Sequence, residues 1–285
     1  MGKNSRIEWT HHTFNPWWGC TKVSAACKHC YAEAWSKRVG QNVWGVKAKR
    51  RFFGEGHWSE PVKWNAEAEE SGTRFRVFCA SMADVFEDRR DLDVWRRKLW
   101  DLIEITRGLD WLLLTKRPEV VGRLVPWGRE WPGNVWLGTT VEDQECAETR
   151  LPYLRELPAA VRFVSAEPLL GPIDIRPWLG STVNWVISGG ESGPNARPSS
   201  PSWFRSLLSQ CKAAKVPFHF KQWGDWAPDP GQSGRRSTAA DDTVMLRLGK
   251  KAAGRLLDGA MWDGLPKALA SSGDRQPNLG RDGSA

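Results

Sequence analysis

The sequence predicts an α/β fold that is built on a parallel β-sheet. From residue 74 onward, short runs rich in Val, Ile, Phe and Trp alternate with helical patterns. The runs are almost continuously apolar, which is typical of parallel strands that are buried on both faces. Small, hydroxylated or charged residues follow each run, as expected where the carboxyl ends of parallel strands form a ligand site. With 285 residues, the chain is long enough for one large α/β domain or two small ones.

Six apolar runs are expected to be the strands of this sheet. They are Phe75–Ala80, Asp110–Thr115, Val135–Thr140, Val161–Ser165, Val183–Ser188 and Pro217–Lys221. An apolar stripe at helical spacing between Leu92 and Ile103 predicts a helix after the first run. A second helix is expected after Ser200, a favourable N-cap residue, because Pro201 fits the first helical position. Strands that alternate with helices predict βα units and a parallel sheet.

The C-terminal part of the chain has a different character. Residues 225–242 are rich in Pro, Gly, Ser and Asp, and this composition predicts a loop. Val244–Leu248 is a candidate extra strand, and residues 249–266 are compact enough to pack back on the domain. Residues 1–266 are therefore expected to form one domain. The polar tail, residues 267–285, is expected to be disordered.

The residues at the ends of the six strands are candidates for one shared cofactor pocket. Parallel strands bring their carboxyl ends to the same edge of a sheet or barrel, so these side chains should converge. Two glycines among them would let a ligand approach the backbone closely, although a tight turn would also explain them. The candidates are Ser81, Asp84, Thr115, Thr140, Ser165, Glu167, Gly189, Gly190 and Glu191.

Three cysteines near the N-terminus, Cys20, Cys27 and Cys30, predict a metal centre. The last two are separated by two residues, so their thiols reach one centre from a single turn of chain. The first follows Gly19, which allows a tight bend. No fourth cysteine lies nearby, and a short helix is expected directly afterwards at Tyr31–Val39.

Spacing alone leaves three interpretations of these cysteines open. Three thiolates without a fourth suit a 4Fe-4S cluster that keeps one iron free for another ligand. A structural zinc ion would use the same thiolates with His29, His11 or His12 as its fourth ligand. Alternatively, the thiols are unligated and simply packed. The remaining cysteines lie in strand or helix patterns and are expected to be packing residues: Cys79, Cys146 and Cys211.

The basic charge of the chain is concentrated near its N-terminus. The formal net charge is +8, and residues 1–64 hold eleven Lys and Arg against four Glu. Residues 40–72 are expected to be an irregular surface segment, with a basic run next to Phe52 and Phe53. Cationic side chains neutralise phosphates, and exposed aromatic rings stack on bases, so DNA or RNA is a candidate partner. The plainer interpretation is that the basic run is a solvated surface loop. The candidate nucleic-acid residues are Lys47, Lys49, Arg50 and Arg51.

The sequence favours a reducing, intracellular setting. It has no run of about 18 apolar residues that would predict a transmembrane helix. No apolar segment follows the basic N-terminus, so no secretory signal is expected. We therefore expect a cytoplasmic protein without membrane contact, where clustered cysteines bind metal or act in catalysis.

Four further motifs accompany the cysteine loop. They are Ala-Glu-Pro-Leu-Leu-Gly-Pro at 166–172, Gly-Gly-Glu-Ser-Gly at 189–193, Phe-Lys-Gln-Trp-Gly at 220–224 and Ala-Gly-Arg-Leu-Leu-Asp-Gly at 253–259. Across roughly residues 5–266 the chain resembles an uncharacterised phage and bacterial protein family with a three-cysteine motif, which is similar to radical S-adenosylmethionine (SAM) enzymes. The resemblance implies a partial (β/α)6 TIM-like barrel, a 4Fe-4S cluster and SAM, and it favours iron–sulfur over zinc.

The resemblance also implies roles for single residues. Cys20, Cys27 and Cys30 match the cluster ligands of radical SAM proteins, and His29 matches the aromatic residue that lies against the SAM adenine. Two features depart from that pattern. Six residues instead of three separate the first two cysteines, and the Gly-Gly-Glu motif lies four strands later than usual. Binding of the SAM amino group is therefore not assigned to Glu191.

Taken together, the residues and the resemblance predict a radical SAM-like enzyme. It would cleave SAM reductively, with an electron from an external donor, and abstract hydrogen from an unknown substrate for which DNA or RNA is a candidate. The alternative is a zinc-stabilised, non-catalytic module that binds nucleic acid. That alternative accounts for the basic, aromatic N-terminal region, but not for six polar strand ends in register.

Overall fold

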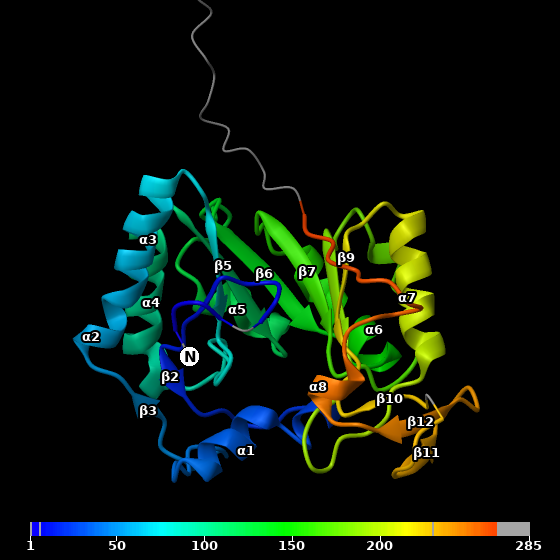
Figure 1. The fold of residues 1–285 in the computed structure, drawn as a ribbon. Coiled ribbons are helices and arrows are strands. Elements are labelled where there is room, and N and C mark those ends of the chain that lie inside the picture. Colours follow the sequence, from blue (N-terminus) through cyan, green and yellow to red (C-terminus); the bar gives the residue numbers. More distant parts are fainter. Residues whose placement is uncertain (1, 6, 230, 267–285) are drawn as a thin grey trace, which may run out of the picture.

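A seven-stranded parallel sheet forms the centre of the fold and curves into a half-barrel (Figure 1). The structure, a computed structural model, describes residues 2–5, 7–229 and 231–266. In spatial order the strands are β1 (His12–Thr13), β4 (Phe75–Cys79), β5 (Leu109–Thr115), β6 (Val135–Thr140), β7 (Val161–Ala166), β8 (Trp185–Gly189) and β9 (Phe218–Gln222). The predicted α/β fold with a partial TIM-like barrel is confirmed. The six predicted runs correspond to β4 through β9, and β1 adds an edge strand beside β4.

Helices flank the sheet on its outer side, with α3 and α4 near one edge and α6 and α7 near the other (Figure 1). The helices are α1 (Tyr31–Arg38), α2 (Glu55–Trp58), α3 (Glu60–Ser71), α4 (Asp93–Ile105), α5 (Pro118–Leu124), α6 (Gln144–Arg155), α7 (Pro201–Ala213) and α8 (Lys250–Ala253). The three helices expected from the sequence are present as α1, α4 and α7. Within the described residues, no helix has the length and apolar character needed to cross a membrane.

The prediction that residues 40–72 are irregular is wrong, because this segment contains α2, α3 and β3 (Arg51–Phe52), which pairs with β2 (Trp17–Trp18). Pro61 stands in the first turn of α3, and Gly72 ends the helix with a left-handed φ of 63°. Only Trp64 and Ala68 bring apolar side chains of α3 into the main core. Two core positions in twelve residues give a weak apolar stripe, so the helix was missed.

The C-terminal part forms a small antiparallel sheet beside the half-barrel. Its strands, in spatial order, are β10 (Trp226–Pro228), β12 (Val244–Arg247) and β11 (Arg236–Thr238). The predicted extra strand at Val244–Leu248 is confirmed as β12, whereas the predicted loop at 225–242 contains β10 and β11. The chain then returns to β9, where the amide of Phe220 donates to the carbonyl of Trp262 at 2.8 Å. The expected disorder of residues 267–285 concerns a segment outside the described residues.

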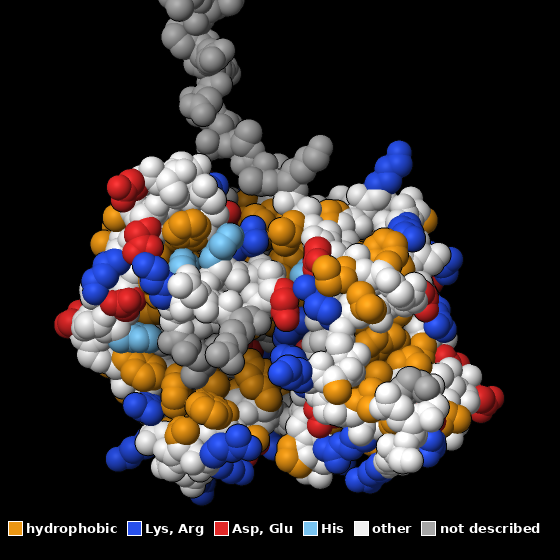
Figure 2. Space-filling model, viewed as in Figure 1, with side chains coloured by type: hydrophobic (Ala, Val, Ile, Leu, Met, Phe, Trp, Pro, Cys, Tyr) orange, Lys and Arg blue, Asp and Glu red, His pale blue; other side chains and the backbone are white. Residues whose placement is uncertain are grey.

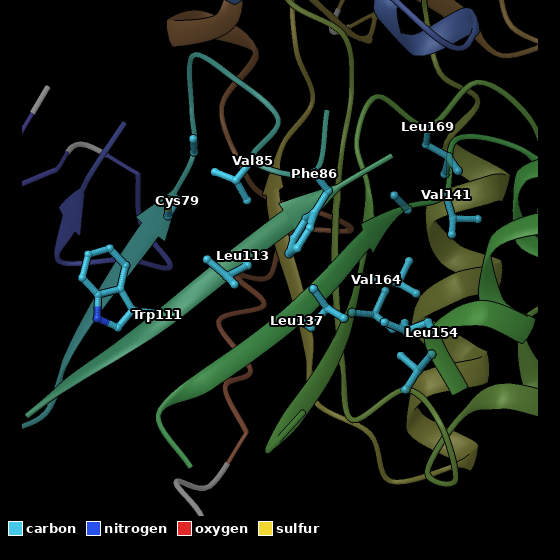
Figure 3. Close-up of a cluster of buried hydrophobic side chains, with 14 of the residues drawn as sticks. Cys79, Val85, Phe86, Trp111, Leu113, Leu137, Val141, Leu154, Val164 and Leu169 are labelled. Carbon is cyan, nitrogen blue, oxygen red and sulfur yellow. The ribbon is translucent and has the colours of Figure 1, made fainter. Parts of the chain in front are cut away.

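Side chains of the sheet alternate between two apolar clusters, as the two-residue repeat of a strand requires. Trp111 and Leu113 of β5 face the helices in a large core that includes the side chains drawn in Figure 3. Leu112, between them, belongs to a smaller cluster on the inner face with Trp136, Phe163, Trp185 and Trp9. This smaller cluster fills part of the inner face with large rings and provides an apolar wall next to the strand ends.

Candidate metal and cofactor site

The cysteine loop begins at a glycine that no other residue could replace without strain. Gly19 has a φ of 114°, and a Cβ at this position would lie 2.3 Å from the carbonyl oxygen of Val43. The tight bend expected at Gly19 is therefore present. Cys20 follows it, Cys27 ends a short 3₁₀ turn, and Cys30 immediately precedes α1.

Cys20, Cys27 and Cys30 line one cavity of about 580 Å³, and all three are free thiols. Cys79 and Cys211 are buried elsewhere, and Cys146 lies on α6, so none of these three lines the cavity. Burial raises the pKa of the Cys20 thiol to about 12 and also raises the pKa of Cys30. Binding of a metal would therefore displace protons from these thiols, because thiolates are the ligating form.

The cavity lies where the strand ends meet, and it gathers nearly all the candidate cofactor residues. Gly190 borders it through the backbone, and only Gly189 lies outside its lining. The other candidates that line it are His29, Ser81, Asp84, Thr115, Thr140, Ser165, Glu167 and Glu191. Figure 2 shows this face hollowed between the half that carries α1 to α3 and the half that carries α7 and the small sheet.

The two glycines have a structural role that differs from the expected close approach of a ligand. A Cβ on Gly190 would lie 1.9 Å from the carbonyl oxygen of Trp223, and a Cβ on Gly189 would lie 3.2 Å from that of Gln222. The backbone after β8 therefore packs directly against the backbone after β9. This packing requires glycine at position 190, and at position 189 it leaves only a tight space for a side chain.

Asp84 holds an arginine that reaches the cysteine loop. Its carboxylate accepts hydrogen bonds from the Thr115 hydroxyl at 2.9 Å and from Nη1 of Arg117 at 2.8 Å. Nη2 of Arg117 donates to the Thr21 carbonyl at 2.6 Å, and its Nη1 lies 3.8 Å from Sγ of Cys20. The Asp84–Arg117 pair is buried, so it fixes the first cysteine from the ends of β4 and β5.

Glu191 has a similar arrangement on the other side of the cavity. Its carboxylate pairs with Arg197 at 2.5 Å, and Nη2 of Arg197 also donates to the Ala25 carbonyl at 3.1 Å. Asp84 and Glu191, which we expected to contact a cofactor, are thus both engaged by arginines. Both arginines donate to backbone carbonyls of the segment between Cys20 and Cys27, so these carboxylates position the cysteine loop.

Arg50, which we expected to face a polyanion, is instead a buried anchor of the same loop. Its side chain is 0 % exposed and pairs with Glu87 at 2.6 Å. It also donates to the Thr21 hydroxyl at 3.1 Å and the Val43 carbonyl at 2.8 Å. This correction removes Arg50 from the candidate nucleic-acid residues.

Lys47, Lys49 and Arg51 remain on the surface. The Arg51 guanidinium lies over the ring of Trp18, 4.7 Å from its centroid, and near Phe53. Figure 2 shows Lys and Arg side chains along the lower edge of this face. The structure therefore divides the basic run into one buried anchor and three surface cations.

The described residues contain no group of three His, Cys, Asp or Glu side chains placed to hold a single metal ion. A cubane cluster makes a different demand, because each thiolate binds a different iron and the sulfurs need not converge on one ion. Three free thiols around a cavity of this size fit that demand. For zinc, His29 lines the cavity, but His11 and His12 do not. Their Nδ1 atoms accept hydrogen bonds from the amides of Arg76 and Asn4.

Sequence reasoning missed several residues of this site. Arg117 stands directly after Thr115 and Lys116 at the end of a predicted strand. This run of polar residues was the only local indication that Arg117 belongs to the site. Arg197 carries no local signal, because only the folded chain shows that it pairs with Glu191. The N-terminal segment was also missed: Ile7 and Trp9 line the cavity from the inner face of the half-barrel.

Comparison with known proteins places the chain in a family. It belongs to the family described as "Protein of unknown function (DUF5131)", whose model matches residues 4–266. Comparison with curated proteins gave no match. Among solved structures, the chain is similar to a mutant of spore photoproduct lyase, with a TM-score of 0.44 and 12 % sequence identity, over 86 % of this chain and 70 % of that one.

Proposed function

We propose that this protein is a radical SAM-like iron–sulfur enzyme. One observation carries the proposal: three free thiols of a single loop line the cavity into which the ends of β4 to β9 project. Within the described residues, no fourth cysteine lines that cavity. Three thiolates would hold a 4Fe-4S cluster and leave one iron for an exogenous ligand, which is what SAM chemistry requires.

Cys20, Cys27 and Cys30 would hold the cluster, and the remaining lining would hold SAM and substrate. When bound, the cluster and SAM supply one-electron chemistry: reductive cleavage of SAM and abstraction of hydrogen from the substrate, with the electron coming from an external donor. The chain itself would bind and orient the cluster, SAM and the substrate, and it would exclude water from them. The apolar side chains of Trp9 and Phe78 line the inner wall of the cavity and would keep water away from the reacting groups.

The polar lining suggests how the protein would orient its ligands. Hydroxyls of Thr140 and Ser165 and the Glu167–Lys221 ion pair, at 2.8 Å, face the same cavity. By its resemblance to radical SAM proteins, His29 is the candidate to lie against the adenine ring. These groups would bind SAM and substrate at fixed positions, and such positioning is the usual contribution of a protein to cofactor chemistry.

The proposal is tested by anaerobic reconstitution with iron and sulfide. We expect a brown protein with about four iron and four sulfide per chain, which releases 5′-deoxyadenosine from SAM after reduction. A Cys30→Ala variant should release none above background. A brown protein that neither cleaves SAM nor changes its spectrum when SAM is added would be a cluster protein of another kind.

The alternative of a zinc-stabilised module rests on the position of His29 in the same cavity as the three cysteines. A Cys3His set would have to converge on one zinc ion in a closed tetrahedral site. Among the described residues no three such side chains are placed to hold a single ion, so this alternative requires the loop to rearrange when zinc binds. The same metal analysis separates the two proposals, because a zinc protein would be colourless and contain no sulfide.

We also propose a nucleic-acid partner, in a cytoplasmic setting that keeps the thiols reduced. The support is the surface part of the basic run next to the cysteine loop: Lys47, Lys49 and Arg51, with the rings of Trp18 and Phe53 beside Arg51. Cations and rings of this kind bind phosphates and unpaired bases. A strand held there would lie near the cavity, as an enzyme that acts on a base requires.

A further inference from the structure

Cationic side chains outnumber carboxylates among the described residues that line the cavity. In the described part of the chain, three carboxylates line it, and each is already paired with a cation: Asp84 with Arg117, Glu167 with Lys221, and Glu191 with Arg197. None of these carboxylates is left to neutralise another cation. Lining cations outside these pairs therefore depend on partners outside the cavity or on a ligand.

Two of those cations have partners outside the cavity. Lys3 pairs with Glu67 at 2.6 Å, and Lys22 pairs with Glu33 at 2.7 Å. Lys116 and Lys250 differ, since neither has a carboxylate within ion-pair distance among the described residues. Lys250 is exposed on α8, where water solvates its charge, whereas Lys116 is half-buried at the end of β5. A half-buried ammonium favours a counter-charge more strongly than an exposed one.

The ammonium of Lys116 has a defined position. Its Nζ donates to the Thr140 hydroxyl at 3.2 Å, which directs it toward the ends of β6 and β7. Glu142 is a further carboxylate near these strand ends, but Arg150 pairs with it at 2.6 Å. An ammonium has three N–H donors, so two of the donors on Lys116 are left for a ligand.

Ser165 supplies a second donor on the strand beside Thr140, the hydroxyl partner of this ammonium. Thr140 and Ser165 are partners in the register of β6 and β7, so their side chains stand on neighbouring strands at the same level. Ser165 is only 3 % exposed and lines the cavity, and its hydroxyl has no hydrogen-bond partner in the described part of the chain. A buried hydroxyl that faces a cavity is expected to donate to a ligand, because an unmade hydrogen bond is costly.

We propose that Lys116, with Ser165, binds an oxyanion of the substrate, either a phosphate ester or a carboxylate. The ammonium supplies the charge, and the hydroxyl fixes the direction of approach. That the oxyanion belongs to a substrate rests on the proposed function, whereas the oxyanion site itself requires no cluster. The site narrows the substrate class to anionic molecules, which include the nucleotides of a nucleic acid.

The experiment measures anion binding to the full-length protein, with and without the reconstituted cluster. Inorganic phosphate and acetate serve as probes of the two oxyanion types, and isothermal titration calorimetry gives their dissociation constants. Lys116→Met keeps the length of the side chain and removes its charge, and Ser165→Ala removes only the hydroxyl. Lys250→Met is the matched control, because it removes one lysine charge from the exposed part of the same cavity lining.

We expect Lys116→Met to weaken binding of the preferred probe at least tenfold and Ser165→Ala to weaken it about threefold. Lys250→Met should change it less than twofold. Stronger binding of phosphate than acetate by the wild type would identify a phosphate ester, and the reverse would identify a carboxylate. Binding that Lys116→Met does not change, or no binding of either probe to the wild type, would overturn the proposal. Circular dichroism and thermal unfolding of each variant ensure that a loss of binding does not reflect a loss of fold.

A separate titration with SAM distinguishes the substrate from the cofactor as the source of the oxyanion. If Lys116→Met weakens SAM binding but leaves the phosphate and acetate titrations unchanged, the site serves the SAM carboxylate and the proposal fails. If the wild type binds a probe through Lys116 but holds no iron–sulfur cluster, the proposed function fails while the oxyanion site stands.

Discussion

The two sides of the cavity use charge in different ways. On the side of the cysteine loop, three arginines are each paired with a carboxylate, and each donates to the segment between Gly19 and Cys27: Arg50, Arg117 and Arg197. On the side of β5 to β7, the ammonium of Lys116 has a hydroxyl partner and, among the described residues, no carboxylate within ion-pair distance. Paired charges hold the chain, and the unpaired charge is left for a ligand.

The paired side explains how a loop without a regular element keeps three thiols in place. Between Gly19 and α1 the chain contains only one short 3₁₀ turn, so few backbone hydrogen bonds define its path. The arginines supply the missing donors to Thr21 and Ala25. Their partner carboxylates come from the chain after β4 and β8, so the position of the loop is set by the half-barrel.

The largest effect that this comparison predicts is loss of the cluster when a loop cysteine is removed. Replacing Cys20, Cys27 or Cys30 by Ala should abolish the visible absorption of the reconstituted protein, because each thiolate binds one iron. Cys146→Ala should keep it, since this half-buried thiol lies on α6 outside the cavity. Absorption spectra with iron and sulfide analysis provide the measurement. A protein that loses its colour in Cys146→Ala, or in a folded Cys79→Ala variant, would contradict the assignment.

The next effect concerns stability and contrasts a buried ion pair with an exposed one. Arg50→Met leaves the Glu87 carboxylate buried without its partner, and removal of one member of a buried pair costs about 3–5 kcal/mol. Arg123→Met breaks the surface pair between Arg123 and Asp88, in which the two side chains are 60 % and 57 % exposed. This variant should leave the urea midpoint unchanged. Equal midpoints for the two variants would show that the Arg50–Glu87 pair does not stabilise the loop.

The sheet was predictable from sequence because its signal is local. Runs such as Val135–Thr140 are apolar on both faces, and the residues that end them are polar. The convergence of Thr140, Ser165 and Glu167 on one cavity followed from the topology alone. The arginine–carboxylate pairs were not predictable, because Arg50 and Glu87 are 37 residues apart and only the folded chain brings them together. In the sequence Arg50 is one member of a basic run, and only its burial in the folded chain distinguishes it from the other members, which are exposed.

A third prediction uses a histidine that is buried without a hydrogen-bond partner among the described residues. His219 of β9 is 2 % exposed, neither ring nitrogen has a hydrogen-bond partner in the described residues, and Asp263 is 3.6 Å away. Burial, with a smaller contribution from Arg255, lowers the pKa of His219 from 6.5 to about 4. Between these values the unfolded chain binds a proton that the folded chain does not, so stability falls as the pH falls, by about 3 kcal/mol in total.

His219→Leu should remove this part of the pH dependence. Unfolding free energies measured in urea at several pH values between 7 and 4 should not run in parallel. The wild-type value minus the variant value should decrease by about 3 kcal/mol over this range, because only the wild type loses the histidine term on acidification. Parallel curves for the two proteins would mean that His219 protonates in the folded state.

A fourth prediction separates two arginines that hold the same loop. Arg117 and Arg197 both donate to loop carbonyls, but only Arg117 lies 3.8 Å from a cysteine sulfur, Sγ of Cys20. Hydrogen bonds and positive charge near cluster sulfurs raise the reduction potential. Arg117→Gln should therefore shift the midpoint potential of the reconstituted cluster to a more negative value, while Arg197→Gln leaves it nearly unchanged. Redox titration followed by electron paramagnetic resonance gives both values, and equal shifts would assign Arg117 a purely structural role.

The smallest effect concerns the surface cations, which the structure reduces from four to three. Replacing Lys47, Lys49 and Arg51 by Ser should weaken binding of single-stranded DNA or RNA and reduce the slope of log Kd against log salt by roughly two or more. Arg50 is left in place because its variant would test stability instead of binding.

A triple variant with the same charge change on other elements, at Arg155, Arg176 and Arg205, serves as the control and should keep the wild-type slope. Fluorescence anisotropy at several salt concentrations gives the slopes. If both triple variants lower the slope equally, net charge alone drives binding, and if the wild type binds neither DNA nor RNA at low salt, the basic run is a solvated surface.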